Sequence, residues 1–145
     1  MKKPEYLIVG AGPVGLILSL LLAKQNKKSH LLELRKKKDA GSDNRALALS
    51  YGTKLALENL GIWTILKKKI TPIQSIHTSQ KNSFGRTLLS AEEYNLPALG
   101  YVVSYGDLSK ALKEEINQSS LVKISYEFEV SAIENKEDKS ILYGR

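Results

Sequence analysis

A glycine-rich turn between an apolar strand and an apolar helix constrains the fold of this chain more than any other feature. The apolar residues Tyr6–Val9 lead into Gly10-x-Gly12-x-x-Gly15, and Pro13 opens the helical run. Proline at the first helical position is preorganised for a helix. The order of strand, glycine loop and helix, followed by a second apolar strand, predicts a βαβ unit with parallel strands.

The three glycines stand at the spacing that a bound pyrophosphate requires. Gly10 permits the tight turn, Gly12 lets the backbone approach the phosphates, and Gly15 lets the helix pack closely on the sheet. The free N–H groups and the positive dipole end at the helix start favour an anion. Glu33 ends the second predicted strand, 18 positions after Gly15, where a carboxylate can accept hydrogen bonds from a ribose hydroxyl. The segment therefore predicts a dinucleotide site.

Two other interpretations of this segment fit less well. Lys2 and Lys3 before the apolar run Val14–Ala23 are typical of a signal peptide, but no small-x-small cleavage site follows. The most apolar part, Leu16–Ala23, is far shorter than the roughly 20 residues that a membrane-spanning helix needs. Burial beneath a parallel sheet accounts for its apolarity.

The composition fits one folded domain and excludes several kinds of site. A chain of 145 residues with 42% hydrophobic residues is long enough for a domain with its own core. The chain has no cysteine, which excludes disulfides, thiolate chemistry and cysteine-based metal sites. The two histidines, His30 and His77, are expected in strands, and they do not predict a metal site.

The net charge of +7 comes mainly from lysine, with runs at Lys36–Lys38 and Lys67–Lys69. Such runs could bind nucleic acid or anionic lipid. No aromatic residues are interleaved with them, and no nucleic-acid-binding motif is present. A solvated basic surface is therefore the favoured interpretation, and no nucleic-acid partner is expected.

The rest of the chain alternates predicted helices and strands. A polar loop over residues 35–44 carries turn residues at 41–44, and a second loop contains Asn82 and Gly85. The segment from Arg45 to Ser50 is expected to lead into a helix, and Asp107 is expected to cap a later one. The predicted helices cover residues 53–60, 62–69 and 108–118, and the predicted strands 73–79, 86–90, 101–104, 122–126, 130–135 and 140–143.

Three segments together carry a resemblance to a known family: Gly10–Gly15, Asp43–Ser50 and Leu57–Trp63. They resemble the FAD-dependent aromatic hydroxylases of the para-hydroxybenzoate hydroxylase type, and most of all the branch that acts in ubiquinone biosynthesis. The resemblance covers nearly the whole chain. It implies an α/β fold with a Rossmann-like FAD-binding βαβ unit. Residues 1–145 would form the N-terminal portion of the FAD-binding domain, with 73–104 as an inserted β-rich layer on the substrate side.

The resemblance also implies roles for particular residues. Gly10, Gly12 and Gly15 would hold the FAD pyrophosphate, Glu33 the adenosine ribose, and Arg45 would lie against the cofactor. The implied reaction is a monooxygenation in which FAD, reduced by NAD(P)H, uses O₂ to hydroxylate a prenylated phenol. No catalytic side chain and no metal site are assigned. The implied location is cytoplasmic, with contact to a membrane surface or to a complex of ubiquinone-biosynthesis proteins left open.

Two departures from the family pattern bear on activity. Ser104 and Tyr105 stand where the family usually has a Glu-Asn type pair that helps to place the flavin. The later Asp-Gly and Gly-Asp motifs of the family lie beyond the segment that this chain matches, so the chain is expected to be incomplete and inactive alone. The alternatives are a non-catalytic dinucleotide-binding module, a decayed gene fragment, or a basic fragment that binds lipid or nucleic acid.

Overall fold

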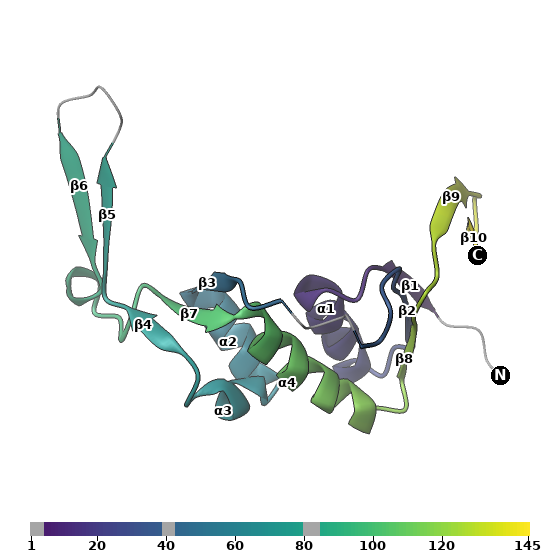
Figure 1. Ribbon diagram of the computed structural model, residues 1–145, viewed down its shortest axis with the longest axis horizontal. Coiled ribbons are helices and arrows are strands. Elements are labelled where there is room, and N and C mark those ends of the chain that lie inside the picture. Colours follow the sequence, from purple (N-terminus) through teal and green to yellow (C-terminus); the bar gives the residue numbers. More distant parts are fainter. Residues whose placement is uncertain (1–4, 39–42, 80–84) are drawn as a thin grey trace. The chain divides into compact units, whose positions relative to one another are not determined.

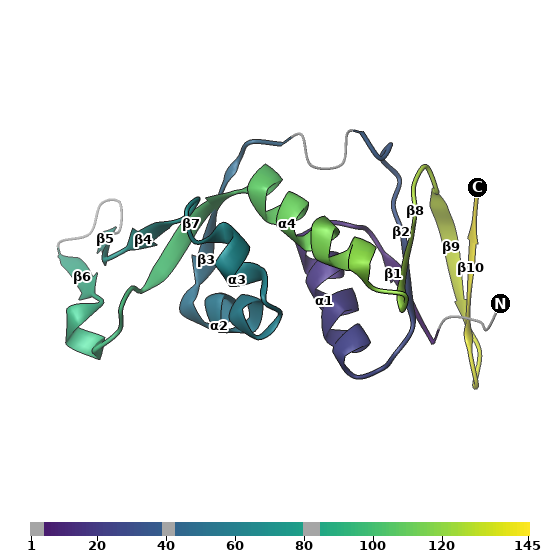
Figure 2. The same cartoon turned by 90° about the horizontal axis from the view of Figure 1, so that it is seen from below.

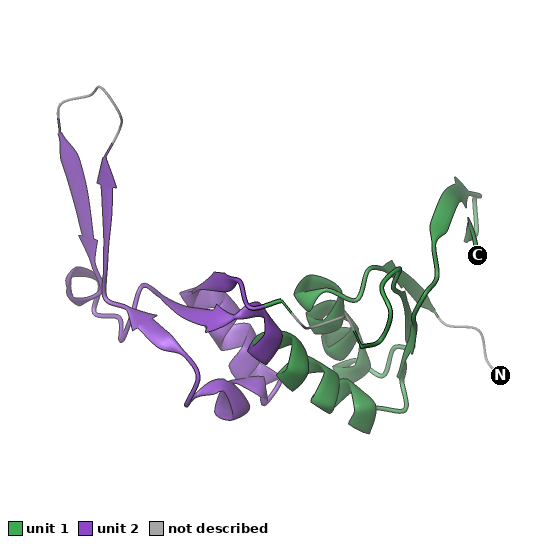
Figure 3. Cartoon of the chain, viewed as in Figure 1, with its two compact units in different colours: residues 1–43, 108–145 green, residues 44–107 purple. Residues whose placement is uncertain are grey.

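The computed structural model describes residues 5–38, 43–79 and 85–145. It divides the chain into two compact units, of which unit 1 contains residues 1–43 and 108–145 and unit 2 contains residues 44–107 (Figure 3). Residues 41 and 42 of the predicted turn 41–44 and the predicted loop position Asn82 lie outside the described residues.

Unit 1 is built on a parallel sheet with strand order β1-β2-β8 (Figure 1). Helix α1 joins β1 to β2 and contacts all three strands, which confirms the predicted βαβ unit. A hairpin of β9 and β10 follows the sheet in sequence. The elements are β1 (Tyr6–Val9), α1 (Pro13–Lys24), β2 (Ser29–Leu32), α4 (Tyr105–Gln118), β8 (Val122–Ser125), β9 (Val130–Asn135) and β10 (Ser140–Gly144).

The core of unit 1 is formed by the apolar faces of these elements. Leu16 and Leu20 of α1 are buried, and so are Leu31 and Leu32 of β2. Helix α4 buries Leu112 and its neighbours on one face, as expected from the helical spacing of its apolar residues. This packing of α1 against the sheet fixes the position of the glycine loop relative to the ends of the strands.

Unit 2 contains an antiparallel sheet with strand order β3-β7-β4 and a separate hairpin of β5 and β6. Its two helices bury Leu57, Ile62, Trp63 and Leu66, and Trp63 packs edge-on against Tyr101 with ring centroids 4.7 Å apart. The elements are β3 (Ala46–Ser50), α2 (Tyr51–Asn59), α3 (Ile62–Leu66), β4 (Thr71–Ile73), β5 (Ser75–Ser79), β6 (Arg86–Ser90), η1 (Glu92–Tyr94) and β7 (Gly100–Ser104).

Two details of unit 2 differ from the sequence-based expectations. Residues 46–50 lead directly into helix α2, as expected, but they form strand β3, which was not predicted; Leu47 and Leu49 are half-buried on one face of the strand. The predicted strand 73–79 is interrupted at Gln74, whose side-chain amide donates to the carbonyl oxygen of Pro97 at 3.1 Å. Residues 73–104 do contain several strands, as expected. That they lie on the substrate side stays a prediction.

The start of α4 also differs from the prediction. The helix begins at Tyr105, so Asp107 lies in its first turn and is not the residue before it. The hydroxyl of Ser104 accepts a hydrogen bond from the Asp107 N–H at 3.0 Å and donates to the Asp107 carboxylate at 2.9 Å. Ser104 therefore caps the helix, and Asp107 is a favourable acidic residue near its N-terminus.

Candidate functional site

The glycine loop has the backbone that its sequence predicts. Gly10 has a φ of 99°, which a residue with a side chain adopts only with strain. A Cβ atom on Gly15 would collide with the carbonyl oxygen of Gly10. The roles predicted for these two glycines in the turn and in helix packing therefore agree with the geometry.

Helix α1 starts directly at this loop without a side-chain cap. Gly12 is the residue before the helix, its backbone is extended, and Pro13 is the first helical residue. The first turn contains no acidic residue. The N-terminus of α1 thus presents backbone N–H groups and the positive dipole end, with no carboxylate in that turn to compete for an anion.

Glu33 lies immediately after β2 and is buried, with 4% of its surface exposed. Its Oε2 accepts a hydrogen bond from the Ala11 N–H at 2.8 Å. Its Oε1 accepts from the backbone N–H of Arg35 at 3.0 Å and from Arg35 Nε at 2.8 Å. A longer bond of 3.3 Å joins Arg35 Nη2 to Oε2. Within the described residues, the carboxylate therefore accepts four hydrogen bonds, which fills its acceptor capacity of about four.

These bonds also determine the charge of Glu33. The hydrogen bond from the Arg35 side chain is the largest influence, and it lowers the pKa of Glu33 to about 2. The backbone N–H groups of Arg35 and Ala11 and the charge of Arg35 act in the same direction, whereas burial opposes them. Glu33 is thus a buried, ionised carboxylate at neutral pH, and it can accept hydrogen bonds but cannot donate them.

Two side chains from distant parts of the sequence belong to the same region. Burial, together with the positive charges of Arg35 and Lys37, lowers the pKa of Lys113. Burial and the negative charge of Glu33 raise the pKa of Tyr126. The Lys113 ammonium lies 6.0 Å from the centre of the Tyr126 ring. Sequence reasoning missed both residues and also Arg35.

The backbone brings these groups together at one edge of the parallel sheet. The N–H of Gly10 donates to Leu32 at 2.7 Å, and the N–H of Phe128 donates to the carbonyl oxygen of Glu33 at 3.0 Å. The carboxyl ends of β1, β2 and β8 are therefore joined around Glu33, and the three strands lie side by side in Figure 2. In open α/β sheets, ligands bind at this edge.

Arg45 lies in unit 2, whereas the three glycines and Glu33 lie in unit 1. Its guanidinium is 5.5 Å from the centre of the Tyr105 ring, and its carbonyl oxygen accepts from the Tyr105 N–H at 2.8 Å. Tyr105, which departs from the family pattern, therefore contacts the arginine that the resemblance assigns to the cofactor. That assignment stays a prediction.

The histidine in the parallel sheet has a structural environment. His30 lies in β2, where its Nε2 is 2.8 Å from the hydroxyl of Ser125 on the neighbouring strand. Burial and the charge of Lys123 lower its pKa. In the described part of the chain, no three histidine, aspartate or glutamate side chains are grouped so that they could hold a metal ion. None of the helices described there is long and apolar enough to cross a membrane.

Comparison with known proteins finds a family and relatives that match most of this chain. The family model described as "FAD binding domain" matches residues 3–142. The chain is 29% identical over 114 residues to the uncharacterized protein slr1300 of Synechocystis, covering 79% of this chain. It is 26% identical over 144 residues to the ubiquinone hydroxylase UbiM of Neisseria meningitidis, covering 94% of this chain.

The fold is also shared with solved structures. The p-nitrophenol 4-monooxygenase PnpA of Pseudomonas putida matches 96% of this chain with a TM-score of 0.73 at 20% sequence identity. The chain spans only part of each of these proteins: 28% of the Synechocystis relative, 31% of the Neisseria relative and 35% of the Pseudomonas structure.

Proposed function

Because this chain belongs to the family of FAD binding domains, we propose that it supplies the adenosine and pyrophosphate end of the FAD site in a flavin-dependent monooxygenase. The observation that carries the proposal is the hydrogen bond from the Ala11 N–H to Glu33. It joins the glycine loop to a buried carboxylate at the edge of the sheet where ligands bind. Both groups belong to unit 1.

The residues fit this part of FAD in two respects. The N–H groups at the start of α1 and the absence of acidic residues from its first turn suit a pyrophosphate. The ionised carboxylate of Glu33 suits the hydroxyl groups of a ribose, because these donate hydrogen bonds. Gly12, at the junction of loop and helix, leaves room for the phosphates to approach the backbone.

Arg35 has a part in this proposal that the sequence pattern did not indicate. The carboxylate of Glu33 already accepts four hydrogen bonds, and two of them come from the Arg35 side chain. A ribose hydroxyl can bond to Glu33 only if it replaces at least one of these, because a carboxylate has about four acceptor positions. The Arg35 side chain therefore moves when the nucleotide binds, while the bond to Ala11 is kept.

The reaction that we propose is the hydroxylation of a prenylated phenol in ubiquinone biosynthesis, with NAD(P)H as the reductant. When bound, FAD supplies the oxygen chemistry; the residues of this chain bind and orient its adenosine end. The resemblance of the motifs to the ubiquinone-biosynthesis branch, and within it to 2-octaprenyl-6-methoxyphenol hydroxylase, supports this choice. The similarity to the Neisseria ubiquinone hydroxylase also supports it. A prenylated substrate would bring the protein to a membrane surface.

The proposal is tested by titrating the 145-residue chain with FAD and with ADP in a calorimeter. We expect both to bind, and we expect Gly12→Val to abolish binding, because a side chain there blocks the phosphates. Gly52→Val is the matched control, since Gly52 is an exposed helical glycine in unit 2 whose added Cβ would meet only ordinary contacts. Equal affinities of the wild type and Gly12→Val contradict the proposal.

Catalysis is tested separately, by measuring NAD(P)H oxidation and product formation with a prenylated phenol in the presence of FAD. We expect no substrate-dependent product from the 145-residue chain. Adding the remaining polypeptide of a relative is expected to restore it. Binding of FAD without product in both cases favours a non-catalytic dinucleotide-binding module.

A further inference from the structure

The carboxylate of Glu33 is paired with a cation that the nucleotide of the proposed site displaces. The side chain of Glu33 is buried, whereas that of Arg35 is 41% exposed and can move into solvent. A buried carboxylate that loses its partner cation is costly, because its charge is then left uncompensated. The displacement of Arg35 therefore requires a second cation close to Glu33.

Lys113 of α4 is a half-buried cation in this region. The Glu33 N–H donates to the carbonyl oxygen of Ser125 at 2.8 Å, so the next residue, Tyr126, is held beside Glu33 at the edge of the sheet. The Lys113 ammonium lies 6.0 Å from the centre of the Tyr126 ring, a distance at which a weak cation–π attraction acts. All of these residues belong to unit 1.

The charges around Lys113 favour an exchange of partners at Glu33. Burial is the main cause that lowers the pKa of Lys113. The positive charges of Arg35 and Lys37 lower this pKa further, whereas the negative charge of Glu33 raises it. Lys113 is therefore within electrostatic reach of both members of the Glu33–Arg35 pair. While Arg35 is bonded to Glu33 it repels the Lys113 ammonium, and once Arg35 has left, the attraction by the carboxylate remains.

The acceptor positions of the carboxylate also leave room for such an exchange. Two of the four hydrogen bonds to Glu33 come from the Arg35 side chain. A lysine ammonium is a compact charge on a flexible stem, and a single hydrogen bond from it fills one acceptor position. One of the two positions that Arg35 vacates is then left for a ribose hydroxyl. Glu33 can therefore bind a ribose and keep a compensating cation at the same time.

We propose that Lys113 replaces Arg35 as the cation beside Glu33 when a nucleotide occupies the glycine-loop site. Lys113 is thus a positioning residue: it keeps Glu33 ionised, and so able to accept hydrogen bonds, while the ribose is bound. The Tyr126 ring holds the ammonium near Glu33 in the nucleotide-free chain. This inference rests on the nucleotide site proposed above, but the exchange of cations is also testable without a nucleotide, because Arg35→Ala leaves Glu33 to Lys113.

The test follows the lysine side chains of the 145-residue chain by NMR, with isotope-labelled lysine and the Lys113 signal assigned from Lys113→Met. A pH titration gives the pKa of Lys113 with and without saturating ADP. We expect ADP to raise this pKa, because the charge of Arg35 has moved away and the ammonium has gained Glu33 as a partner. Arg35→Ala should raise it in the same way without any nucleotide.

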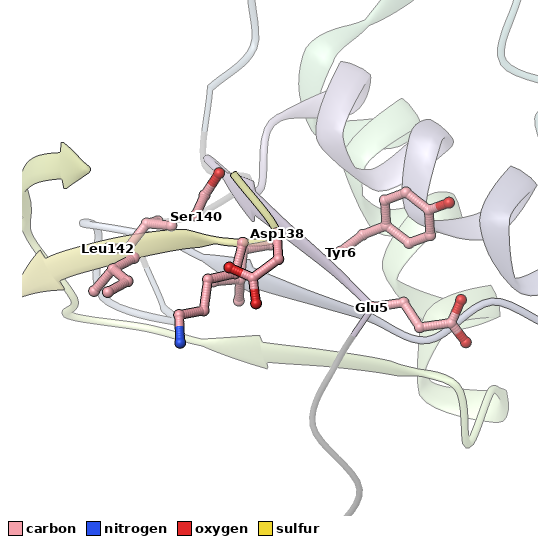
Figure 4. Close-up of a pocket in the computed structure, with 8 residues that line it drawn as sticks. Glu5, Tyr6, Asp138, Ser140 and Leu142 are labelled. Atoms are coloured by element: carbon pink, nitrogen blue, oxygen red, sulfur yellow. The ribbon is translucent and has the colours of Figure 1, made fainter. Parts of the chain in front are cut away.

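Lys139 is the internal control for this measurement. It belongs to unit 1 but lines a groove of about 750 Å³ between residues 5–7 and 138–142 (Figure 4). Neither Glu33 nor Lys113 lines this groove. The signal of Lys139 should therefore stay the same when ADP is added, whereas that of Lys113 should move.

Calorimetry and urea unfolding separate this role from a merely structural one. Lys113→Met is expected to weaken ADP binding by about tenfold. It should leave the unfolding of the nucleotide-free chain unchanged, because Arg35 compensates Glu33 in that state. Lys110→Met is the matched control, since Lys110 is an exposed lysine of the same helix, and it should change neither property. Lys113→Arg keeps the charge and should retain most of the affinity.

The proposal is overturned if the pKa of Lys113 fails to rise in Arg35→Ala, or fails to rise in the wild type with ADP bound. It is also overturned if Lys113→Met and Lys110→Met have equal effects on ADP affinity. Failure of ADP to bind the wild type would instead contradict the nucleotide site proposed above, and a raised pKa of Lys113 in Arg35→Ala would still support the exchange of cations at Glu33.

Discussion

The carboxylate of Glu33 accepts a hydrogen bond of 2.8 Å from the backbone N–H of Ala11, across 22 positions of sequence. The bond connects the end of the second parallel strand with the middle of the glycine loop. It gives Glu33 a structural task beside the binding task that the sequence pattern predicts. The first prediction concerns this double role.

Replacing Glu33 with glutamine is expected to lower both stability and nucleotide affinity. The variant loses the charge-assisted bonds to Arg35 in a buried position, so we expect the free energy of unfolding to fall by about 1–3 kcal/mol. We expect ADP affinity to fall by about tenfold, because the ribose hydroxyls then meet a neutral acceptor in place of an ionised carboxylate. Urea unfolding and calorimetry measure the two effects. Glu58→Gln is the control, because Glu58 is an exposed residue that pairs with Lys54 one helical turn away, and its replacement should change stability by about 1 kcal/mol or less. Equal effects of the two substitutions would contradict the role of Glu33.

The second prediction concerns pH. Folding lowers the pKa of Glu33 from 4.5 to about 2, so the folded state favours the ionised form. The resulting stabilisation is complete above about pH 4.5 and is lost as the pH falls toward 2. Arg35→Ala removes the main cause of the shift and should therefore flatten the decline of stability over this range. Urea unfolding of the wild type and the variant between about pH 2 and pH 6 measures this, and parallel curves would argue against it.

Arg35→Ala also tests the competition for the carboxylate. The substitution frees two acceptor positions on Glu33 and leaves the bond to Ala11. We expect ADP to bind several-fold more tightly, because binding no longer has to break the bonds between Arg35 and Glu33, which costs about 1 kcal/mol of free energy. Calorimetric titration measures the Kd. A weaker affinity in the variant would mean that Arg35 contacts the nucleotide instead of competing with it.

The fourth prediction concerns helix packing at Gly15. A Cβ atom there would collide with the carbonyl oxygen of Gly10 and would press on Ile8 at 3.3 Å. We expect Gly15→Ala to destabilise unit 1 by about 1–3 kcal/mol, despite the higher helix propensity of alanine. Gly52→Ala, in an exposed helical position where an added Cβ would meet only the Ser50 hydroxyl at 3.8 Å, should instead stabilise by about 0.5–1 kcal/mol. Thermal unfolding compares the two, and the same sign of effect in both would refute the packing argument.

The fifth prediction concerns the cap of α4. Ser104→Ala removes the acceptor for the Asp107 N–H and is expected to lower the free energy of unfolding by about 1 kcal/mol. Ser50 provides the comparison, because its hydroxyl accepts from the Thr53 N–H at the start of α2. Ser50→Ala should have an effect of similar size. If Ser104→Ala is as stable as the wild type, another group accepts the hydrogen bond from the Asp107 N–H at the start of the helix.

Sequence patterns within a short segment predicted the βαβ unit well. The site residues that they did not predict are brought there by contacts between distant parts of the sequence. The glycine loop, Pro13 and the position of Glu33 are encoded within about thirty consecutive residues, as is typical of this unit. Lys113 and Tyr126 join the site only because β8 pairs with β2, and no local sequence signal indicates that pairing. Arg35 could have been noticed from its position two residues after Glu33.

Strand β3 illustrates a different limit. Its sequence, Ala-Leu-Ala-Leu-Ser, alternates as a strand does, but alanine and leucine are also strong helix formers. Pairing with β7 decides the outcome, and this pairing involves residues about fifty positions away. The start of α4 was misjudged for a simpler reason, because Ser104 and Asp107 are both good capping residues and only the contacts distinguish them.

The two tasks of Glu33 have a consequence for protein engineering. Ligand preference at sites of this kind is commonly changed by exchanging the acidic residue for one that accepts a 2′-phosphate. In this chain such an exchange would also remove the carboxylate that accepts the hydrogen bond from the Ala11 N–H. The backbone N–H of Ala11 in the glycine loop would then lack this acceptor. A redesign of sugar preference therefore needs a second substitution that supplies a new acceptor for the loop.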